Sequence, residues 1–211
     1  LKVIYDAAHA FASEVDGKSI FDYGDVSTAS FHATKLFHTI EGGAVFSADE
    51  QVRNRMSYMR NFGHNGPETF SGIGINGKNS EFHAAMGCVN LDYIDMILEK
   101  RKHDSGQYIE ALEGSGLVYQ DIQEGAKSNY SYFPILFKNE GQLQEVFKQL
   151  AVEKIIPRRY FHPCVDELDY VQQAACPIAR DISSRIACLP LSYQLEQREI
   201  ERVGDIIKNS L

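Results

Sequence analysis

The stretch Ser30-Phe31-His32-Ala33-Thr34-Lys35 begins at the end of one predicted strand and leads toward the next in a 211-residue chain. Val26 to Phe31 has the composition of a short strand, and Gly42 to Phe46 reads as a further strand entered through a glycine pair. Upstream, Leu1 to Tyr5 is an apolar run that ends in Asp6, a pattern typical of a buried parallel strand. This half of the chain is therefore expected to be α/β, as part of a larger layered domain.

Apolar residues at helical spacing organise the rest of the chain. A long helix is predicted from Glu81 through Ala111, with Asn79 or Ser80 as its cap and a break near Asp92. The later elements predicted are two strands and then two helices: Leu117 to Ile122, Tyr130 to Phe137, Leu143 to Leu150 and Leu195 to Ile207. We therefore expect one domain over residues 1–103 and a compact α+β domain over residues 104–211.

The composition is that of an ordinary folded protein. The chain is 44% hydrophobic and 24% charged, and it is long enough to bury a substantial core. Its net charge of −8 comes without a basic stripe, which argues against nucleic acid or an anionic membrane surface as a partner. No apolar run approaches the ~20 residues of a membrane span, and the first residues do not resemble a signal peptide, so a cytoplasmic location is expected.

The cysteines and histidines show no metal-binding pattern. Cys88, Cys164, Cys176 and Cys188 are widely spaced, include no C-x-x-C pair and read as reduced structural thiols. The seven histidines are scattered, without an H-E-x-x-H motif. We therefore expect no metal site.

Three polar side chains stand where pyridoxal phosphate would need them. This cofactor acts as an electron sink, so it needs a lysine that holds it as a Schiff base and a carboxylate that keeps its pyridine nitrogen protonated. Lys35 offers the amine, Asp6 offers a carboxylate at the end of a predicted parallel strand, and Ser30 offers a hydroxyl for the phosphate. Alone, each residue is ordinary: a solvated lysine, a turn aspartate and a strand-end serine. Their combination favours the cofactor.

Further blocks of sequence extend this pattern, in a fixed order, over nearly all of the chain. They are Asp6-Ala7-Ala8-His9-Ala10, Gly24-Asp25, the Ser30 to Lys35 stretch, Glu41 to Val45, Arg60-Asn61-Phe62-Gly63, Gly74 to Lys78, Ser80 to Gly87 and Arg158 to Pro163. Together they resemble the sugar-nucleotide aminotransferases of the DegT/DnrJ/EryC1/StrS family. The resemblance implies part of the large domain of a fold-type I pyridoxal-phosphate aminotransferase, followed by a small C-terminal α+β domain.

The resemblance also implies roles for single residues. Lys35 matches the Schiff-base lysine, Asp6 the partner of the pyridine nitrogen, and His9 the Gln-or-His position beside the cofactor ring. Ser30 matches a phosphate ligand. Asn76 matches an asparagine that reaches the phosphate from the neighbouring subunit, which implies a homodimer with shared active sites; from spacing alone, Asn76 reads as a turn residue.

The activity implied is transamination of a keto-sugar nucleotide, such as dTDP-4-keto-6-deoxyglucose, with glutamate as the amino donor. Such reactions serve deoxyaminosugar and surface polysaccharide biosynthesis. Related dehydratases carry histidine in place of the lysine, so Lys35 favours transamination. Arg158 and Arg159 suit a diphosphate electrostatically, although solvated surface arginines fit their pattern equally well.

The sequence departs from the family in three respects. Ile40 stands where glycine is usual, and a β-branched residue does not easily take a positive φ there. Lys78 stands where arginine is frequent and lacks its bidentate fork. The long N-terminal segment of the family, with further phosphate-binding residues and the aromatic residue that stacks on the cofactor, has no counterpart, so the chain reads as a fragment.

Two other functions compete with this one. Gly72-Ile73-Gly74-Ile75-Asn76-Gly77 spells G-x-G-x-x-G, the fingerprint of a dinucleotide-binding oxidoreductase. That motif needs an apolar strand directly before it, and Phe62 to Ser71 has the composition of a loop. The second competitor is a non-catalytic fragment that only folds and dimerises, with exposed apolar surface where missing strands should pack.

Overall fold

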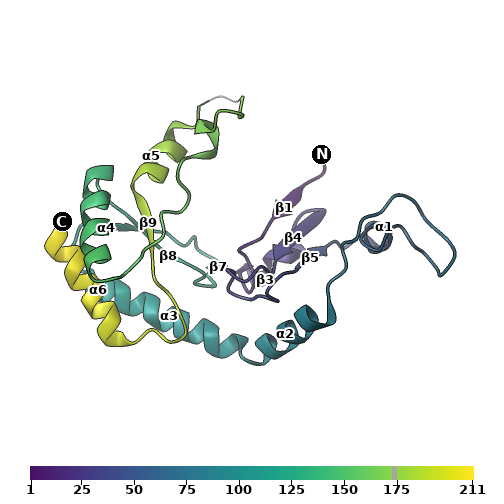
Figure 1. The fold of residues 1–211 in the computed structure, drawn as a ribbon, viewed down its shortest axis with the longest axis horizontal. Coiled ribbons are helices and arrows are strands. Elements are labelled where there is room, and N and C mark those ends of the chain that lie inside the picture. Colours follow the sequence, from purple (N-terminus) through teal and green to yellow (C-terminus); the bar gives the residue numbers. More distant parts are fainter. Residues whose placement is uncertain (173–174) are drawn as a thin grey trace. The chain divides into compact units, whose positions relative to one another are not determined.

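The computed structural model describes residues 1–172 and 175–211 and divides the chain into two compact units. The first unit is Leu1–Met96 with Ile122–Ser131, and the second is Ile97–Asp121 with Tyr132–Leu211. The segment Ile122–Ser131 therefore belongs to the first unit although second-unit sequence flanks it on both sides. Figure 1 labels helices α1 to α6 and those strands for which there is room. The expected domains of residues 1–103 and 104–211 stay a prediction.

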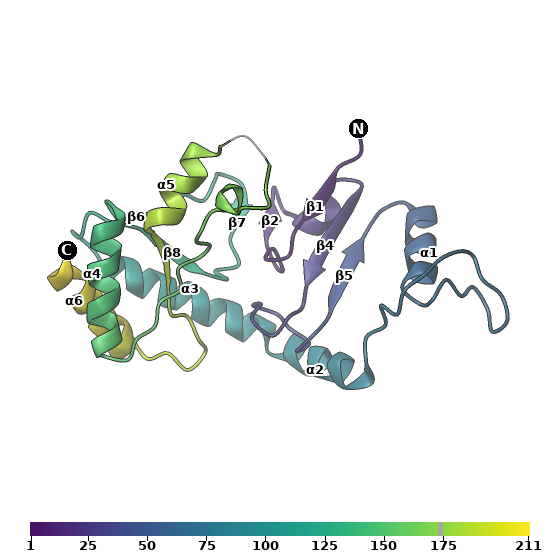
Figure 2. The same ribbon diagram turned by 45° about the horizontal axis from the view of Figure 1, so that its top comes forward.

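A three-stranded sheet organises the first unit. Strand β1 (Ile4–Asp6) pairs in parallel with β4 (Val26–Ser30), and β4 pairs antiparallel with β5 (Gly43–Phe46), as Figure 2 shows. In the register, Asp6 lies opposite Thr28 and Ser30 lies opposite Gly43. The predicted strands and the predicted parallel pairing are confirmed. Because β1 and β4 are parallel, both lead into loops at the same edge of the sheet.

The predicted burial of the first strand is wrong. Ile4 is 70% exposed and Tyr5 is 42% exposed. The physical reason is that β1 is the edge strand of its sheet, with β4 as its one neighbour in the strand order β1-β4-β5. The apolar run therefore pairs along its backbone without burying its side chains among the described residues.

A second small sheet holds the segment Ile122–Ser131 in the first unit. Its strands are β2 (Glu14–Val15), β3 (Lys18–Ser19) and β7 (Ala126–Lys127), in the order β3-β2-β7 and antiparallel throughout. A short 3₁₀ helix, η1 (Ile20–Asp22), follows β3. The sequence analysis does not predict these two-residue strands. Strands β2 and β3 form a short hairpin, and β7 joins them from a distant part of the chain.

Two of the helices between Glu50 and Ala111 agree with the sequence prediction. Helix α2 (Glu81–Asp92) begins at the Ser80 cap, whose side chain accepts a hydrogen bond from the His83 backbone N–H. Helix α3 (Ile94–Ala111) follows after Tyr93, so the predicted break near Asp92 is confirmed. Helix α1 (Glu50–Met59), capped by Asp49, is not predicted, because its sequence has few apolar residues.

The second unit is an α+β layer. Its sheet has the order β6-β8-β9 and is antiparallel, with strands β6 (Val118–Tyr119), β8 (Phe133–Leu136) and β9 (Ile186–Leu189). Its further helices are α4 (Glu140–Val152), η2 (Val165–Glu167), α5 (Pro177–Arg185) and α6 (Gln197–Ser210). The predicted helices around Leu143 and Ile200 are confirmed, whereas α5 and β9 are not predicted.

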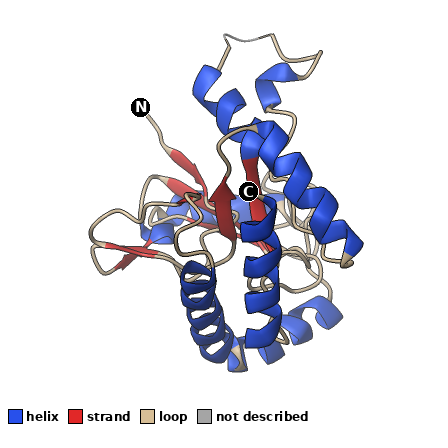
Figure 3. Ribbon diagram, turned by 90° about the vertical axis from the view of Figure 1, so that its left-hand side faces the viewer, coloured by secondary structure: helices blue, strands red, loops and turns tan. Residues whose placement is uncertain are grey.

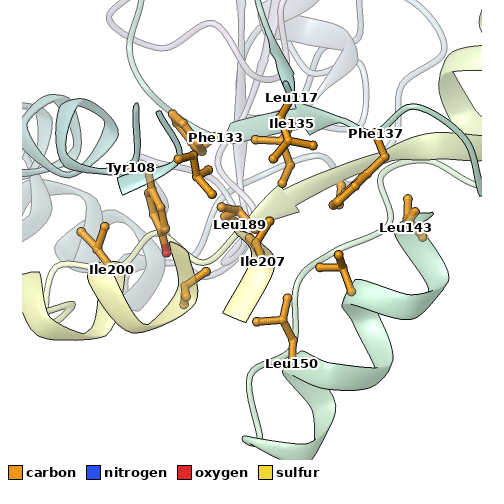
Figure 4. Close-up of a cluster of buried hydrophobic side chains, with 14 residues drawn as sticks. Tyr108, Leu117, Phe133, Ile135, Phe137, Leu143, Leu150, Leu189, Ile200 and Ile207 are labelled. Atoms are coloured by element: carbon orange, nitrogen blue, oxygen red, sulfur yellow. The ribbon is translucent and has the colours of Figure 1, made fainter. Parts of the chain in front are cut away.

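The core of the second unit lies between this sheet and the helices α3, α4 and α6. Helix α6, which runs to the C-terminus marked in Figure 3, packs against α4. Figure 4 shows Leu143 and Leu150 from α4 and Ile207 from α6 directed toward Ile135 of β8. All four side chains are fully buried. At roughly 1.5–3 kcal/mol for each large apolar side chain removed from water, such a cluster is the main favourable term for this unit.

The structure also bears on membrane and metal binding. No helix among the described residues has the length and apolar character needed to cross a bilayer. Within residues 1–172 and 175–211, no group of three histidine, cysteine, aspartate or glutamate side chains is arranged to hold a metal ion. The four cysteines, all within the described residues, form no disulfide with one another.

We predict that Val146→Ala lowers the free energy of unfolding by about 2 kcal/mol, because it removes two buried methyl groups and leaves a cavity. Urea unfolding of the variant measures the loss. Val152→Ala is the matched control on the same helix, since Val152 is 73% exposed, and its change should stay below about 0.5 kcal/mol. Equal losses at the two valines would contradict this position of the core.

Candidate active site

Lys35 and His9 meet at the edge of the sheet where β1 and β4 end. The Lys35 Nζ atom lies 2.5 Å from His9 Nε2, although 26 residues separate the two in sequence. His9 follows β1 by three residues and Lys35 follows β4 by five, so the parallel pairing of these strands brings their loops together. Both side chains are half-buried. The structure thus brings together two residues that the sequence predicts for one site.

Asp6 and Ser30 end the same two strands. Asp6 closes β1, and its carboxylate Oδ1 accepts a hydrogen bond of 3.2 Å from the Ala8 backbone N–H. Ser30 closes β4, and its hydroxyl oxygen accepts one of 3.4 Å from the His32 backbone N–H. The sheet therefore presents a carboxylate, a hydroxyl, an amine and an imidazole from one edge.

The pKa of His9 is lowered from its ordinary value. Burial is the largest cause, because it penalises the charged imidazolium. The positive charge of Lys35 lowers the pKa further, and the negative charge of Asp6 opposes both effects. His9 is consequently neutral at neutral pH, and Nε2 in its unprotonated tautomer can accept a hydrogen bond from the Lys35 ammonium group.

Aromatic packing fixes the loop that carries Lys35. The ring of Phe37, two residues beyond Lys35, is buried and stacks on the ring of Phe11, with 4.4 Å between centroids and 13° between planes. The ring of Phe31 meets Phe37 edge to face at 5.0 Å. These contacts join both ends of the lysine loop to the loop that carries His9. The sequence analysis does not identify this cluster.

Helix α2 supports the same loop from another side. The Asn90 side-chain amide donates a hydrogen bond of 2.8 Å to the His38 carbonyl oxygen. A Cβ atom on Gly87 would lie 2.8 Å from the Thr39 Cγ2 atom, so only glycine allows this close approach of helix and loop. Asn90 is a supporting residue that the sequence analysis misses, because its partner lies 52 residues away.

Ile40 has the positive φ that a β-branched residue does not easily adopt. Its φ is 67°, and the Glu41 backbone N–H donates a hydrogen bond of 2.9 Å to the Thr39 carbonyl oxygen across it. This hydrogen bond closes a three-residue γ-turn in which the central residue has a positive φ, a rare and strained arrangement. The turn leads the chain from the lysine loop back into β5.

Asn76 belongs to the long segment between α1 and α2, where it forms an isolated bridge with Asn61. It sits in the loop after α1, which leads away from the three-stranded sheet in Figures 1 and 2. Its side-chain oxygen accepts a hydrogen bond of 2.6 Å from Lys78 Nζ, and Lys78 lies 3.9 Å from the centroid of the Phe62 ring. No regular strand or helix separates α1 from α2, so the G-x-G-x-x-G stretch lacks the strand that a dinucleotide site requires.

The two arginines predicted for a diphosphate differ in the structure. Arg159 donates hydrogen bonds to Glu140 Oε1 at 2.5 Å and to the Ser184 carbonyl oxygen at 2.9 Å. These contacts engage Arg159 within its own unit. Arg158 is exposed, and its guanidinium lies 5.6 Å from the centroid of the Tyr160 ring.

We predict opposite shifts of the His9 pKa in two variants. Lys35→Met removes a nearby positive charge and should raise the pKa, whereas Asp6→Asn removes a nearby negative charge and should lower it further. The measurement is an NMR titration of the imidazole in the chain without cofactor. Shifts of the same sign in the two variants would contradict the arrangement of these three groups.

We predict that Ile40→Gly stabilises the chain by about 1 kcal/mol, because a positive φ costs an L-residue roughly 1–2 kcal/mol and glycine gives back part of this in unfolded-chain entropy. Chemical denaturation measures the change. Ile40→Ala keeps the Cβ atom, so it should lack the gain. A loss of stability in the glycine variant would show that the turn is not strained.

Comparison with known proteins identifies a family model and two relatives that match nearly all of the chain. The sequence model of the DegT/DnrJ/EryC1/StrS aminotransferase family matches residues 1–208. The chain is 37% identical to a dTDP-4-amino-4,6-dideoxy-D-glucose transaminase of Shigella dysenteriae, over 99% of this chain and 59% of that protein. It is 31% identical to the transaminase of the same name from Escherichia coli, over 98% of this chain and 58% of that protein.

A solved structure agrees with these relatives. The crystal structure of DesI in the presence of its TDP-sugar product superimposes with a TM-score of 0.90 and 30% sequence identity. The superposition covers 99% of this chain and 55% of DesI. The chain therefore spans less than two thirds of the length of each of these proteins.

Proposed function

Since the chain belongs to the DegT/DnrJ/EryC1/StrS aminotransferase family, we propose that it forms the lysine-bearing part of a pyridoxal-phosphate-dependent enzyme that aminates a keto-sugar nucleotide. The contact of 2.5 Å between Lys35 Nζ and His9 Nε2, at the sheet edge where Asp6 ends β1, is the observation that carries the proposal. The chain spans 59% of the length of the Shigella relative, and the proposed activity is that of an enzyme of the relative's full length.

The residues at the sheet edge fit pyridoxal phosphate by their chemistry. The cofactor needs a primary amine, and Lys35 supplies one that is half-buried. It needs a carboxylate at its ring nitrogen, which Asp6 supplies, and the flat imidazole of His9 stands beside the amine. Ser30 supplies a hydroxyl for the phosphate from the end of the neighbouring strand.

The chain's own residues then have distinct tasks in transamination. When bound, pyridoxal phosphate supplies an electron sink for the charge that develops at the carbon next to the transferred amine. With the cofactor bound, Lys35 would be the general base that moves the proton from the α-carbon of the amino donor to the cofactor. Asp6 keeps the ring nitrogen protonated, and His9, neutral because burial lowers its pKa, accepts a hydrogen bond that orients the lysine amine.

We propose a more specific substrate than family membership alone indicates. The Shigella and Escherichia relatives are named transaminases of dTDP-4-amino-4,6-dideoxy-D-glucose, so we propose a dTDP-4-keto-6-deoxy sugar as acceptor. Glutamate as donor is proposed from the family resemblance alone. We further assign the reaction to the cytoplasm and to surface polysaccharide synthesis.

A homodimer is part of the proposal. Asn76 would reach the phosphate of the partner's cofactor, since its loop leads away from its own sheet edge. Lys78 occupies the Asn76 side-chain oxygen, which leaves the amide N–H groups of Asn76 to donate to a phosphate.

A non-catalytic dimerising fragment is the second candidate. Exposed apolar side chains favour it, since Ile73 is 92% exposed, Phe82 is 88% exposed and Ile4 is 70% exposed. Such surface marks places where further protein packs. In that case, this polypeptide folds and associates without binding cofactor.

We predict that borohydride reduction of the chain with pyridoxal 5′-phosphate leaves the cofactor on Lys35, as read by peptide mass mapping. Lys35→Arg keeps the positive charge but cannot form the bond, so labelling of this peptide should disappear. Lys18, which is exposed on β3 of the small sheet, serves as the internal control for non-specific reaction. Equal labelling of Lys18 and Lys35 would rule out a cofactor site in this chain and leave the fragment reading.

A further inference from the structure

Asn129 uses both hydrogens of its side-chain amide on the loop that carries His9. Its Nδ2 atom donates to the His9 carbonyl oxygen and to the Phe11 carbonyl oxygen, each at 2.8 Å. Its Oδ1 atom accepts a hydrogen bond of 3.0 Å from the Ser131 backbone N–H. The side chain is buried, at 6% exposure. Both donors of Asn129 are thus committed to one short stretch of backbone, about 120 residues away.

The small sheet explains why Asn129 faces that stretch. Glu14 of β2 pairs with Lys127 of β7, and Val15 pairs with Ala126. Continuing this antiparallel register by two residues places Asn129 opposite Ala12, next to Phe11. The chain around Ala12 forms turns, and Ala12 itself has a φ of 62°. In a turn, the His9 and Phe11 carbonyl oxygens have no neighbouring strand from which to accept a backbone hydrogen bond. The Asn129 side chain on the opposite segment donates to them instead.

The stretch that Asn129 holds is in contact with the lysine loop at two points. The His9 imidazole lies 2.5 Å from Lys35 Nζ, and the Phe11 ring stacks on Phe37, two residues beyond Lys35. A displacement of the backbone between residues 9 and 11 would therefore move the imidazole relative to the amine and loosen the stacked rings together. Geometry at a reacting amine is sensitive, since a misplacement of ~1 Å can cost on the order of 100-fold in rate.

We infer that Asn129 is a positioning residue of the active site, which fixes the His9 imidazole against the Lys35 amine through its two hydrogen bonds to the His9 and Phe11 carbonyls. This inference rests on the proposed function, because the site is an active site only if Lys35 binds the cofactor. It assigns a role to the segment Ile122–Ser131, which belongs to the first unit but is flanked in sequence by the second.

The test compares variants without an amide at position 129. Asn129→Leu has a similar branched shape but no donor, and Asn129→Ala leaves room for water at the two carbonyls. The first readout is the His9 pKa from an NMR titration of the chain without cofactor. We expect it to rise toward the ordinary histidine value, because the imidazole leaves its half-buried place beside the Lys35 charge.

The second readout is the rate at which borohydride traps pyridoxal 5′-phosphate on Lys35, and we expect it to fall on the order of tenfold or more. Ser27→Ala is the matched control, because it removes a buried hydrogen bond of 2.9 Å to the Tyr23 carbonyl oxygen in the same unit. It should lower stability while leaving the His9 pKa and the trapping rate unchanged.

Different results would contradict the positioning role of Asn129 and the proposed function. Wild-type values of the His9 pKa in both Asn129 variants, or an equal pKa change in Ser27→Ala, would overturn the positioning role. If Asn129→Leu does not fold, Asn129→Ala decides. Absence of trapping on Lys35 in the unsubstituted chain would instead overturn the proposed function, and the His9 titration would still test Asn129 without any cofactor.

Discussion

Parallel pairing of β1 with β4 is the constraint on which the candidate active site depends. Antiparallel pairing would send the loops after the two strands to opposite edges, so that a carboxylate at the end of one strand could not share a site with an amine beyond the other. With Asp6 opposite Thr28, the chain after each strand leaves at one edge, and His9 meets Lys35. This edge is also where α/β sheets generally hold their ligands.

The loops at this edge have no regular secondary structure, and side-chain contacts with residues distant in sequence hold them in place. Phe37 packs against Phe11, Asn90 of α2 holds the lysine loop, and Asn129 holds the histidine loop. The site tolerates one strained residue, Ile40, at the return into β5. Strain of this kind persists only where the surroundings determine the conformation. On either side of Ile40, Asn90 holds the His38 carbonyl oxygen and the Thr39 hydroxyl donates to the Glu41 carbonyl oxygen.

The sequence predicts an element or a site correctly where the spacing of nearby apolar residues or a short block of residues indicates it. The regular apolar spacing of α2 and the apolar run before Asp6 predict their elements, and the blocks around Lys35 predict the family. It fails where the signal lies in distant partners. The polar sequence of α1 hides a helix, the two-residue strand β7 exists only through its pairing with β2, and Asn129 resembles any loop asparagine until its two acceptors are known.

The most direct measurement is a crystal structure of the chain with pyridoxal 5′-phosphate bound. The account predicts continuous electron density from Lys35 Nζ into the cofactor, with the pyridine nitrogen at a hydrogen-bonding distance of about 2.8 Å from the Asp6 carboxylate and the His9 ring beside it. Attachment of the cofactor to another lysine, or a pyridine nitrogen directed away from Asp6, would contradict it.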